Sequence, residues 1–341
     1  MNIGVIGMGG LGTLHFKNLM KMPAVRVTGI CDVRPERLTG DWAGTVTNLE
    51  QQRSENFDIS AIAKFTDYRD LLKTDVQAVL IATPTFLHAE MAIAAMEAGK
   101  HVFCEKPMAL NSADAARMAA VAKRCGRILQ IGHVLRFWPE YIEAKAMIDD
   151  RRFGALRSVD CHRGGGFPGW AWENWFNRAE LSGLAAVDLH IHDVDVIHWW
   201  LGMPTSVSSQ GVWDGEGANE ILTLYRGTAA SLVQTHAYWV TGPCGFEMGF
   251  TLGFERATVV YGLGEKPGLT IFEKDAEASR FQSVAVGAGD GYFVEVEYFV
   301  DCVIHNKPND RLPPDEVVGA MKIVEAELRS SKSGQWDNVA V

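Results

Sequence analysis

The spacing of three glycines near the start of the chain predicts a phosphate-binding turn. Gly7, Gly9 and Gly12 form a G-x-G-x-x-G pattern between an apolar run that reads as a strand and a segment with helical spacing. We expect Gly7 to allow a sharp turn, Gly9 to let the backbone approach a pyrophosphate, and Gly12 to let the helix pack closely on the strand. This chemistry is the binding of a dinucleotide.

The residues around this turn add charge and hydrogen-bonding groups. Gly10 and Leu11 belong to the same turn and are expected to contact the cofactor. The helix expected over 14–20 presents free amides and a partial positive charge to phosphates at its N-terminus. Asp32 follows a second buried strand, 25–31, and its carboxylate could accept hydrogen bonds from the adenosine ribose hydroxyls. Arg34 could stack on adenine or reach a 2′-phosphate. We therefore expect NAD as the cofactor and consider NADP the weaker alternative.

Two further segments should lie at the same edge of the sheet. Thr83 and Pro84 follow one apolar run, and Glu105 and Lys106 follow another, each long enough for a buried parallel strand. Ligands of a doubly wound sheet bind beyond the carboxyl ends of its strands, so we expect both segments at the nicotinamide half of the cofactor. His88 could contact the cofactor there or only cap a helix. Lys106, if desolvated, could transfer a proton; it could equally stabilise a surface turn.

The order of these elements predicts an α/β fold with two domains. Strands and helices alternate up to residue 131, which implies a Rossmann doubly wound parallel sheet in residues 1–131. The polar stretch 40–56 reads as an irregular excursion. Short connections with glycine between later strands imply an α+β domain with an open, mostly antiparallel sheet in residues 132–341. The last helix could pack back on the first domain.

Composition excludes several classes of protein. The chain has 341 residues, of which 47% are hydrophobic and 22% charged, as expected of a globular protein. A net charge of −10 argues against nucleic acid as a partner. The six cysteines form no C-x-x-C pair, which indicates reduced thiols and a cytoplasmic location. No apolar run is long enough to predict membrane insertion, and the first residues do not read as a secretion signal.

Taken together, these motifs resemble the glucose-fructose oxidoreductase/inositol dehydrogenase (Gfo/Idh/MocA) family. The resemblance covers essentially the whole chain, and its most specific parts are Glu105-Lys106-Pro107 and a later segment, 188–195, followed by Trp200-Leu201-Gly202. It implies that Lys106 and the pair formed by Asp188 and His192 converge on the substrate carbinol as the catalytic group. In relatives the bond between Lys106 and Pro107 is often cis.

The residue spacing agrees with part of this implication. Asp188 and His192 are four residues apart, so on a helix they share a face, and the carboxylate would orient the ring. Either His192 or Lys106 could accept the hydroxyl proton. His190 stands where relatives commonly carry glycine, and His190 with His192 could suggest a metal site. We expect no metal, because side chains two apart on a helix diverge.

The second domain contains candidates for substrate binding. Arg136 could face a cleft or form an interdomain ion pair. The glycine-rich loop that begins at Gly164 carries Trp170, Trp172 and Trp175, whose aromatic faces suit the CH groups of a sugar or polyol ring. Each tryptophan could instead be a packing anchor.

The sequence therefore predicts an NAD(H)-dependent dehydrogenase that oxidises a secondary alcohol of a sugar, inositol or related polyol. Two alternatives are a glycoside hydrolase or isomerase that recycles bound NAD, and a regulatory protein that keeps the Rossmann site without catalysis. Relatives form oligomers through the open face of the second sheet, so we expect a homodimer or homotetramer. We expect neither nucleic acid nor a membrane as a partner.

Overall fold

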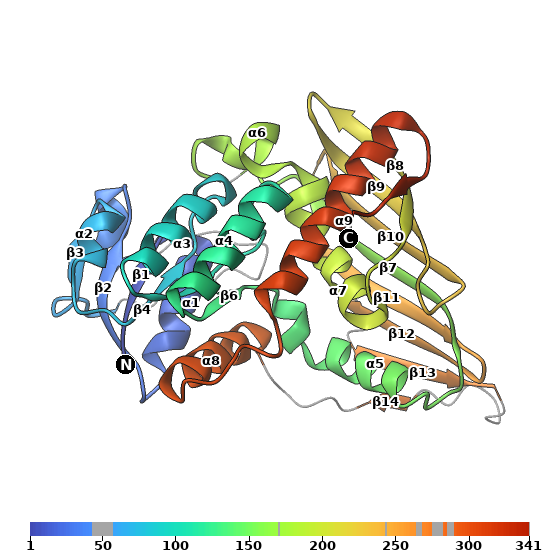
Figure 1. Cartoon of the computed structure of the whole chain (residues 1–341), viewed down its shortest axis with the longest axis horizontal. Coiled ribbons are helices and arrows are strands. Elements are labelled where there is room, and N and C mark those ends of the chain that lie inside the picture. The colour runs from blue at the N-terminus through green and yellow to red at the C-terminus, as the bar shows by residue number, and fades with distance from the viewer. Residues whose placement is uncertain are drawn as a thin grey trace. The chain divides into compact units, whose positions relative to one another are not determined.

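The computed structural model describes residues 1–42, 57–169, 171–242, 244–263, 268–274, 282–284 and 290–340 (Figure 1). Trp170 and most of the predicted excursion at 40–56 lie outside the described residues. The chain divides into two compact units. The first contains Met1–Val134 and Asp290–Val318, and the second contains Leu135–Gly289 and Gly319–Val341.

In the described part of the first unit, six parallel strands form one sheet in the order β3-β2-β1-β4-β5-β6. The strands are β1 Asn2–Ile6, β2 Arg26–Cys31, β3 Ala63–Phe65, β4 Ala78–Ile81, β5 His101–Cys104 and β6 Leu129–Ile131. The strand order reverses between β1 and β4, as in doubly wound sheets that bind dinucleotides. The predicted Rossmann sheet is confirmed.

Helices connect these strands. They are α1 Gly10–Met20, η1 Pro35–Leu38, α2 Tyr68–Leu72, η2 Thr85–Leu87, α3 His88–Glu97 and α4 Ser112–Cys125. Two of them, α2 and α4, begin at a residue whose side chain caps the helix. Asn111 caps α4 by accepting a hydrogen bond from the Asp114 amide, which explains why the helix begins there. Figure 1 shows α3 and α4 side by side.

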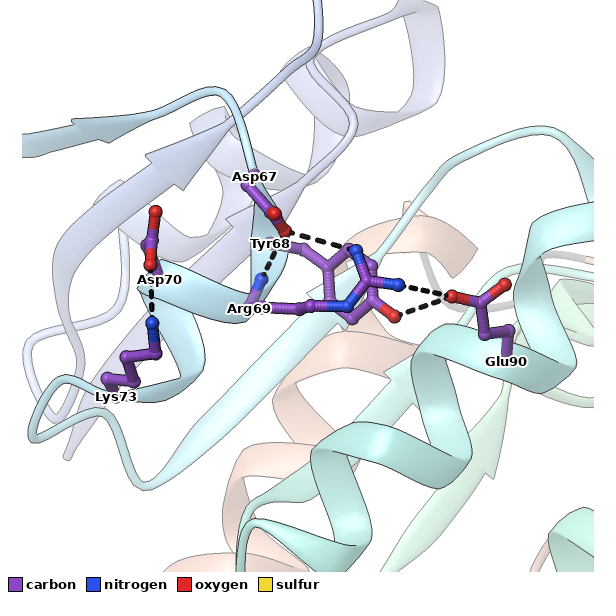
Figure 2. A network of polar contacts seen from close by, with 6 residues as sticks. All are labelled: Asp67, Tyr68, Arg69, Asp70, Lys73 and Glu90. Atoms are coloured by element: carbon purple, nitrogen blue, oxygen red, sulfur yellow. Dashed lines mark hydrogen bonds and ion pairs between the residues drawn. The ribbon is translucent and has the colours of Figure 1, made fainter.

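An exposed polar network joins α2 to α3 (Figure 2). Glu90 of α3 accepts hydrogen bonds from the Tyr68 hydroxyl and from Arg69 Nη2, each at 2.8 Å. Lys73 pairs with Asp70 on α2 at 2.7 Å. Burial, together with the bond to Glu90, raises the pKa of Tyr68 to about 12. The network therefore combines a partly buried tyrosine hydroxyl with ion pairs between exposed side chains.

Helix α8, Gly291–Ile304, also belongs to the first unit, although the sequence separates it widely from β6. Its residues Val296 and Phe299 share a core with Phe16 of α1 and Phe103 of β5. The ring centroids of Phe103 and Phe299 lie 5.9 Å apart. Burial of this apolar face against α1 and β5 therefore attaches a distant helix to the Rossmann sheet.

This packing corrects the predicted domain boundaries. We expected the second domain to run without interruption over 132–341, whereas residues 290–318 belong to the first unit. The last helix, α9 Pro314–Ser333, was expected to pack back on the first domain. It begins within the first unit and from Gly319 onwards belongs to the second.

In the described part of the second unit, nine strands form one sheet in the order β14-β13-β12-β11-β7-β10-β9-β8-β15. They are β7 Leu156–Gly166, β8 Ser206–Asp214, β9 Gly217–Arg226, β10 Leu232–Val240, β11 Glu247–Phe254, β12 Ala257–Leu263, β13 Gly268–Glu273, β14 Gln282–Val284 and β15 Asp337–Asn338. Strands β7 and β10 are parallel, and the other neighbouring pairs are antiparallel. The predicted, mostly antiparallel sheet is confirmed.

Helices pack on one face of this sheet. Tyr141 of α5 and Trp200 of α7 contact Phe250 of β11, with ring centroids 5.0 and 5.1 Å apart. The helical segments of this unit are η3 Val134–Phe137, α5 Pro139–Asp149, η4 Trp172–Asn177, α6 Ala179–Ser182, the π-helical turn η5 Ala185–Leu189, α7 Ile191–Leu201 and α9.

Among the described residues, no helix is both long enough and apolar enough to cross a membrane.

The loop predicted to begin at Gly164 differs from the structure. Gly164, Gly165 and Gly166 extend β7 and pair with β10. A Cβ atom on Gly164 would lie 2.1 Å from the ring carbon Cζ of Tyr238, so the aromatic ring occupies the space above this glycine. Glycine is therefore required there by close packing within a strand.

Candidate active site

The glycine turn after β1 has the geometry that its sequence predicts. Gly7 has a φ of +89°, which favours glycine, and its amide donates to the Cys31 carbonyl at 2.8 Å. A Cβ atom on Gly12 would lie 1.8 Å from the Gly7 carbonyl oxygen, so α1 packs directly on the turn. A Cβ atom on Gly9 would have no heavy atom within 4 Å. The backbone at Gly9 is therefore open to a ligand.

The start of α1 provides hydrogen-bond donors beside this open position. The Thr13 amide donates to the Gly9 carbonyl at 2.9 Å and closes the first turn of the helix. The amides of Gly10, Leu11 and Gly12 precede that bond and have no acceptor within the helix. These donors and the helix dipole fit a pyrophosphate, and the open space at Gly9 fits its approach.

Asp32 is held beside the turn at the end of β2. Its Oδ2 accepts a hydrogen bond from the Met8 amide at 2.8 Å, and its Oδ1 accepts one from the Arg34 amide at 2.9 Å. The Arg34 Nε atom lies 3.6 Å from the same Oδ1. The carboxylate is thus fixed in place next to the glycine turn, where an acceptor for ribose hydroxyls is required.

His88 does not offer its ring nitrogens to a cofactor, which corrects one predicted contact. The ring is buried, with Nδ1 2.7 Å from the Pro107 carbonyl and Nε2 2.9 Å from the Thr83 carbonyl. Burial lowers the pKa of His88 despite these hydrogen bonds, and a neutral ring can donate to only one of the two carbonyls. His88 instead links the segment of Thr83 and Pro84 to the segment after β5.

Glu105 is likewise turned into the protein and does not face a ligand directly, which corrects its predicted role. Its Oε1 lies 2.6 Å from Nε2 of His15 in α1, and its Oε2 accepts a hydrogen bond from the Lys106 amide at 3.1 Å. Lys106 is half-buried, and its bond to Pro107 is cis, as the resemblance implies. Glu105 therefore supports the backbone at Lys106 from inside the unit.

Glu295 of α8 completes a buried cluster with His15 and Glu105. One ligand atom from each residue lies within 4.8 Å of the others, and neither Glu295 oxygen has a hydrogen-bond partner among the described residues. Burial and the charges of Glu105 and Asp290 raise the pKa of Glu295 well above its ordinary value. Burial also acts to raise the pKa of Glu105, but the bond and charge of His15 and the charge of Lys106 lower it overall.

The spacing within this cluster indicates a shared proton. Two ligands of one zinc ion, each about 2.1 Å from the metal, lie roughly 3.4 Å apart in tetrahedral geometry. The His15 and Glu105 atoms are 2.6 Å apart, which is the distance of a charge-assisted hydrogen bond. We therefore interpret the His15–Glu105 contact as a hydrogen bond within a buried polar cluster.

Asp188 and His192 lie in two consecutive helical segments, whereas we expected one helix. Asp188 belongs to the π-helical turn η5, and His192 belongs to the first turn of α7. The two segments meet at His190, whose amide donates to the Ala185 carbonyl at 2.8 Å. Asp188 is buried and His192 is half-buried.

His190 points to a different partner from the one that a metal site with His192 would require. Its Nε2 lies 3.1 Å from Glu327 Oε2 of α9 and 3.4 Å from Thr235 Oγ1 of β10. Tyr225 of β9 donates to Glu327 Oε1 at 2.6 Å. The ring is therefore part of an internal polar network of the second unit.

Arg136 also has an internal role, which corrects its predicted contact with substrate and the alternative of an interdomain pair. Its guanidinium forms two hydrogen bonds with Asp195 of α7, at 2.9 and 2.8 Å, and both side chains are 1% exposed. Asp195 lies in the same unit. A second buried pair, Arg163 with Asp193, joins β7 to the first turn of α7.

The two described tryptophans of the predicted substrate loop are half-buried. Trp172 and Trp175 lie in η4, and the ring of Trp175 stacks on Phe176 with centroids 3.9 Å apart. Phe176 packs against a core cluster that contains Leu184 and Leu189, which flank Asp188. The loop is thus attached to the segment that carries Asp188.

The structure assigns the predicted site residues to both units. The first unit brings the glycine turn, Asp32, Thr83, Pro84 and Lys106 to the carboxyl ends of neighbouring parallel strands. The second unit contains Asp188 and His192, together with Arg136, Trp172 and Trp175.

Sequence reasoning missed His15, Glu295 and Glu327. A signal was present for both carboxylates, because Glu295 precedes Phe299 by four residues on the buried face of α8. Glu327 follows Ile323 by four residues on a buried face of α9. An acidic residue at a core position of a helix requires an internal partner.

The fold and this edge of the sheet define a dinucleotide-binding Rossmann protein. Residues 1–133 match the family profile described as "Oxidoreductase family, NAD-binding Rossmann fold", and residues 141–243 match the "GFO/IDH/MocA C-terminal domain". An inositol 2-dehydrogenase of Rubrobacter xylanophilus is 30% identical over 276 residues, which is 75% of this chain and 70% of that protein. The chain belongs to the Gfo/Idh/MocA family, and its first unit is an NAD-binding Rossmann domain.

Other similarities cover less sequence or show the fold alone. The oxidoreductase YrbE of Bacillus subtilis is 30% identical over 210 residues, or 61% of this chain and 56% of that protein. The matches with several curated relatives span only about half of the relative's length. The match with myo-inositol 2-dehydrogenase of Thermotoga maritima, for example, covers 55% of that protein. A levoglucosan dehydrogenase in complex with NADH and levoglucosan has a TM-score of 0.84, at 21% identity over 100% of both chains.

Proposed function

We propose that the protein is an NAD(H)-dependent dehydrogenase that oxidises a secondary alcohol of a sugar, inositol or related polyol. The observation that carries this proposal is the position of Lys106. It follows β5 at the edge of the sheet where the glycine turn and Asp32 lie. A group that can transfer a proton therefore stands at the edge where the cofactor's reactive half is expected.

The residues of the first unit suit NAD. Gly9 and the first amides of α1 would hold the pyrophosphate, and Asp32 would accept hydrogen bonds from the adenosine ribose. The Arg34 guanidinium lies beside the Asp32 carboxylate. The carboxylate would repel a 2′-phosphate, and this repulsion supports NAD over NADP. When bound, NAD supplies a carbon that accepts a hydride.

The chain itself would supply the proton transfer. We propose that Lys106 or His192 accepts the proton of the substrate hydroxyl, while Asp188 orients the ring of His192. The backbone of Lys106 is supported by Glu105, and the turn that carries Asp188 is held by the interior of the second unit. Both groups thus rest on rigid elements, as acid-base catalysis requires.

The proposed substrate class rests on three observations. Curated relatives of this chain are named inositol 2-dehydrogenases, and a structural neighbour contains levoglucosan. Trp172 and Trp175 have half-buried aromatic rings, which suit the CH groups of a sugar or polyol ring. Trp175 stacks on Phe176, which packs against the leucines that flank Asp188. A homodimer or homotetramer and a cytoplasmic location stay predictions.

The test combines a substrate panel with one substitution. Reduction of NAD and of NADP is followed by absorbance of the reduced nicotinamide across polyols, aldoses and sugar acids. Reduction with NAD and one class of alcohol is expected. Lys106→Met should then lower kcat about 100-fold or more while NAD binding is retained, because acid-base catalysis typically contributes at least that factor.

Lys73→Met is the matched control. Lys73 is an exposed lysine of the same unit, so its loss should leave turnover unchanged. Unchanged turnover in Lys106→Met would remove Lys106 from the mechanism. Tight NAD binding without reduction on any alcohol would favour the hydrolase or isomerase that recycles NAD, or a regulatory protein.

A further inference from the structure

We infer that His190 is a positioning residue: through Glu327 of α9 it holds the turn that places Asp188 and His192. This inference rests on the proposed function, in which His192 is a candidate proton acceptor and Asp188 orients its ring. It accounts for a histidine that the dehydrogenase chemistry itself does not use. The residues that carry it all belong to the second unit.

The turn that carries Asp188 has an unusual backbone. Gly183 has a φ of +72°, and Leu184, which is buried, has a φ of +57°. A leucine in this region of conformational space is strained, and the turn continues as a π-helix closed by the bond from the His190 amide to the Ala185 carbonyl. Such a conformation persists only where its surroundings hold it.

His190 makes two polar contacts at the end of this turn: an ion-pair distance to Glu327 and a hydrogen bond with Thr235. Its ring is fully buried, with Nε2 3.1 Å from Glu327 Oε2 and 3.4 Å from Thr235 Oγ1. The Tyr225 hydroxyl lies 2.8 Å from Thr235 Oγ1 and donates to Glu327 Oε1 at 2.6 Å. The imidazole therefore contacts β10 and α9 directly, and Tyr225 of β9 bonds to both of its partners.

The position of His190 in the chain makes this attachment relevant to the site. It lies two residues after Asp188 and two before His192, so its ring points to a different side of the helical segments from theirs. Its carbonyl accepts hydrogen bonds from the amides of Asp193 and Val194, which begins α7. Fixing the His190 ring in the interior therefore fixes the orientation of both neighbouring segments.

The experiment compares three variants of the full chain. His190→Leu removes the polar attachment, and His190→Gln keeps an amide nitrogen that can reach Glu327. Ser330→Ala is the control: Ser330 is buried one turn beyond Glu327 on α9, but it binds the Ser209 amide of β8 at 2.9 Å and not His190. Each variant is measured for kcat, for KM of alcohol and NAD, for thermal stability, and for amide hydrogen exchange in residues 184–192.

We expect His190→Leu to lower kcat about 10- to 100-fold, with little change in KM for NAD, because small misplacement of catalytic groups has effects of this size. Exchange in residues 184–192 should become faster. His190→Gln should recover most of the turnover. Ser330→Ala should lower thermal stability without changing kcat or the exchange of this segment.

Two results would overturn the inference. One is a His190→Leu enzyme that loses stability but keeps the kcat of the parent, since the histidine would then have only a structural role. The other is exchange in residues 184–192 that stays at the parental rate. If the parent protein turns over no alcohol, the proposed function fails, and the exchange measurement still tests whether His190 holds the turn.

Discussion

Each unit contains a buried histidine-glutamate pair beside a segment that carries a proposed catalytic residue. In the first unit, His15 pairs with Glu105, the residue before Lys106. In the second, His190 lies between Asp188 and His192 in the chain and pairs with Glu327 of α9. The side chains of both pairs are at most 5% exposed. The same residue types thus lie beside the segments of the proposed catalytic residues in both units.

The two networks differ in their third member. Glu327 receives a hydrogen bond from the Tyr225 hydroxyl, whereas the third member beside Glu105 is a second carboxyl, Glu295, without a hydrogen-bond partner among the described residues. Burial, aided by the charge and hydrogen bond of Glu327, raises the pKa of Tyr225, so its hydroxyl remains a donor. In the second network, the Tyr225 hydroxyl therefore donates a hydrogen bond that holds Glu327 in place. The first network instead contains Glu295, whose pKa is raised by burial and by the charges of Glu105 and Asp290.

The largest effect is expected from breaking the first pair. His15→Leu leaves the Glu105 carboxylate buried without its closest partner, so the free energy of unfolding should fall by about 3–5 kcal/mol. Denaturant unfolding of the full chain measures this loss. His15→Leu with Glu105→Gln should recover part of it, because the double variant leaves no unpaired charge. A loss below about 1 kcal/mol would mean that the pair behaves as if it were exposed.

The difference between the networks predicts opposite effects of the same substitution. Burial, with the charges of Glu105 and Asp290, raises the pKa of Glu295 above 4.5, so the folded state holds this proton more tightly than the unfolded chain. The parent therefore loses stability as pH rises from about 4.5 towards the folded pKa. Glu295→Gln removes this loss and should stabilise the protein increasingly with pH.

Glu327→Gln is the counterpart in the second unit and should destabilise by about 1–2 kcal/mol at neutral pH, because hydrogen bonds to a charged acceptor are stronger than those to a neutral amide. Thermal unfolding of both variants between pH 5 and about 8 measures the contrast, a range in which most proteins are stable. The same sign for both substitutions would contradict the distinction between the two networks.

These networks also mark the limit of what the sequence predicted. Local patterns located the glycine turn and the strands of the Rossmann sheet, because each depends on residues close together in the chain. For His88 and Arg136 the sequence left a ligand contact open beside a second interpretation. Both side chains are buried against partners, Pro107 and Asp195, that lie far along the chain. No local pattern reports such pairings.

The attachment of α8 to the Rossmann sheet was missed for the same reason. Its apolar face predicts burial but does not name the surface that it covers. Glu295 on that face was the strongest available signal, since a carboxylate at a core position requires a specific environment. Glu327 gives the equivalent signal on α9, and its partner His190 was instead weighed as a metal ligand.

The smallest effect is expected in the exposed network of Figure 2, which provides the reference for both buried pairs. Arg69 and Glu90 are 58% and 60% exposed and lie 2.8 Å apart, a distance similar to that of the buried pairs. Arg69→Ala should lower the free energy of unfolding by only about 0.2–1 kcal/mol, because solvent screens the attraction. Lys73→Ala, which breaks a second exposed pair, should cost no more.

Salt separates screening from other causes of a small effect. The cost of Arg69→Ala should vanish near 1 M salt, where the screening length is about 3 Å, while the cost of His15→Leu should persist. Denaturant unfolding at low and high salt measures both. If Arg69→Ala costs as much as His15→Leu, burial does not strengthen the His15–Glu105 pair.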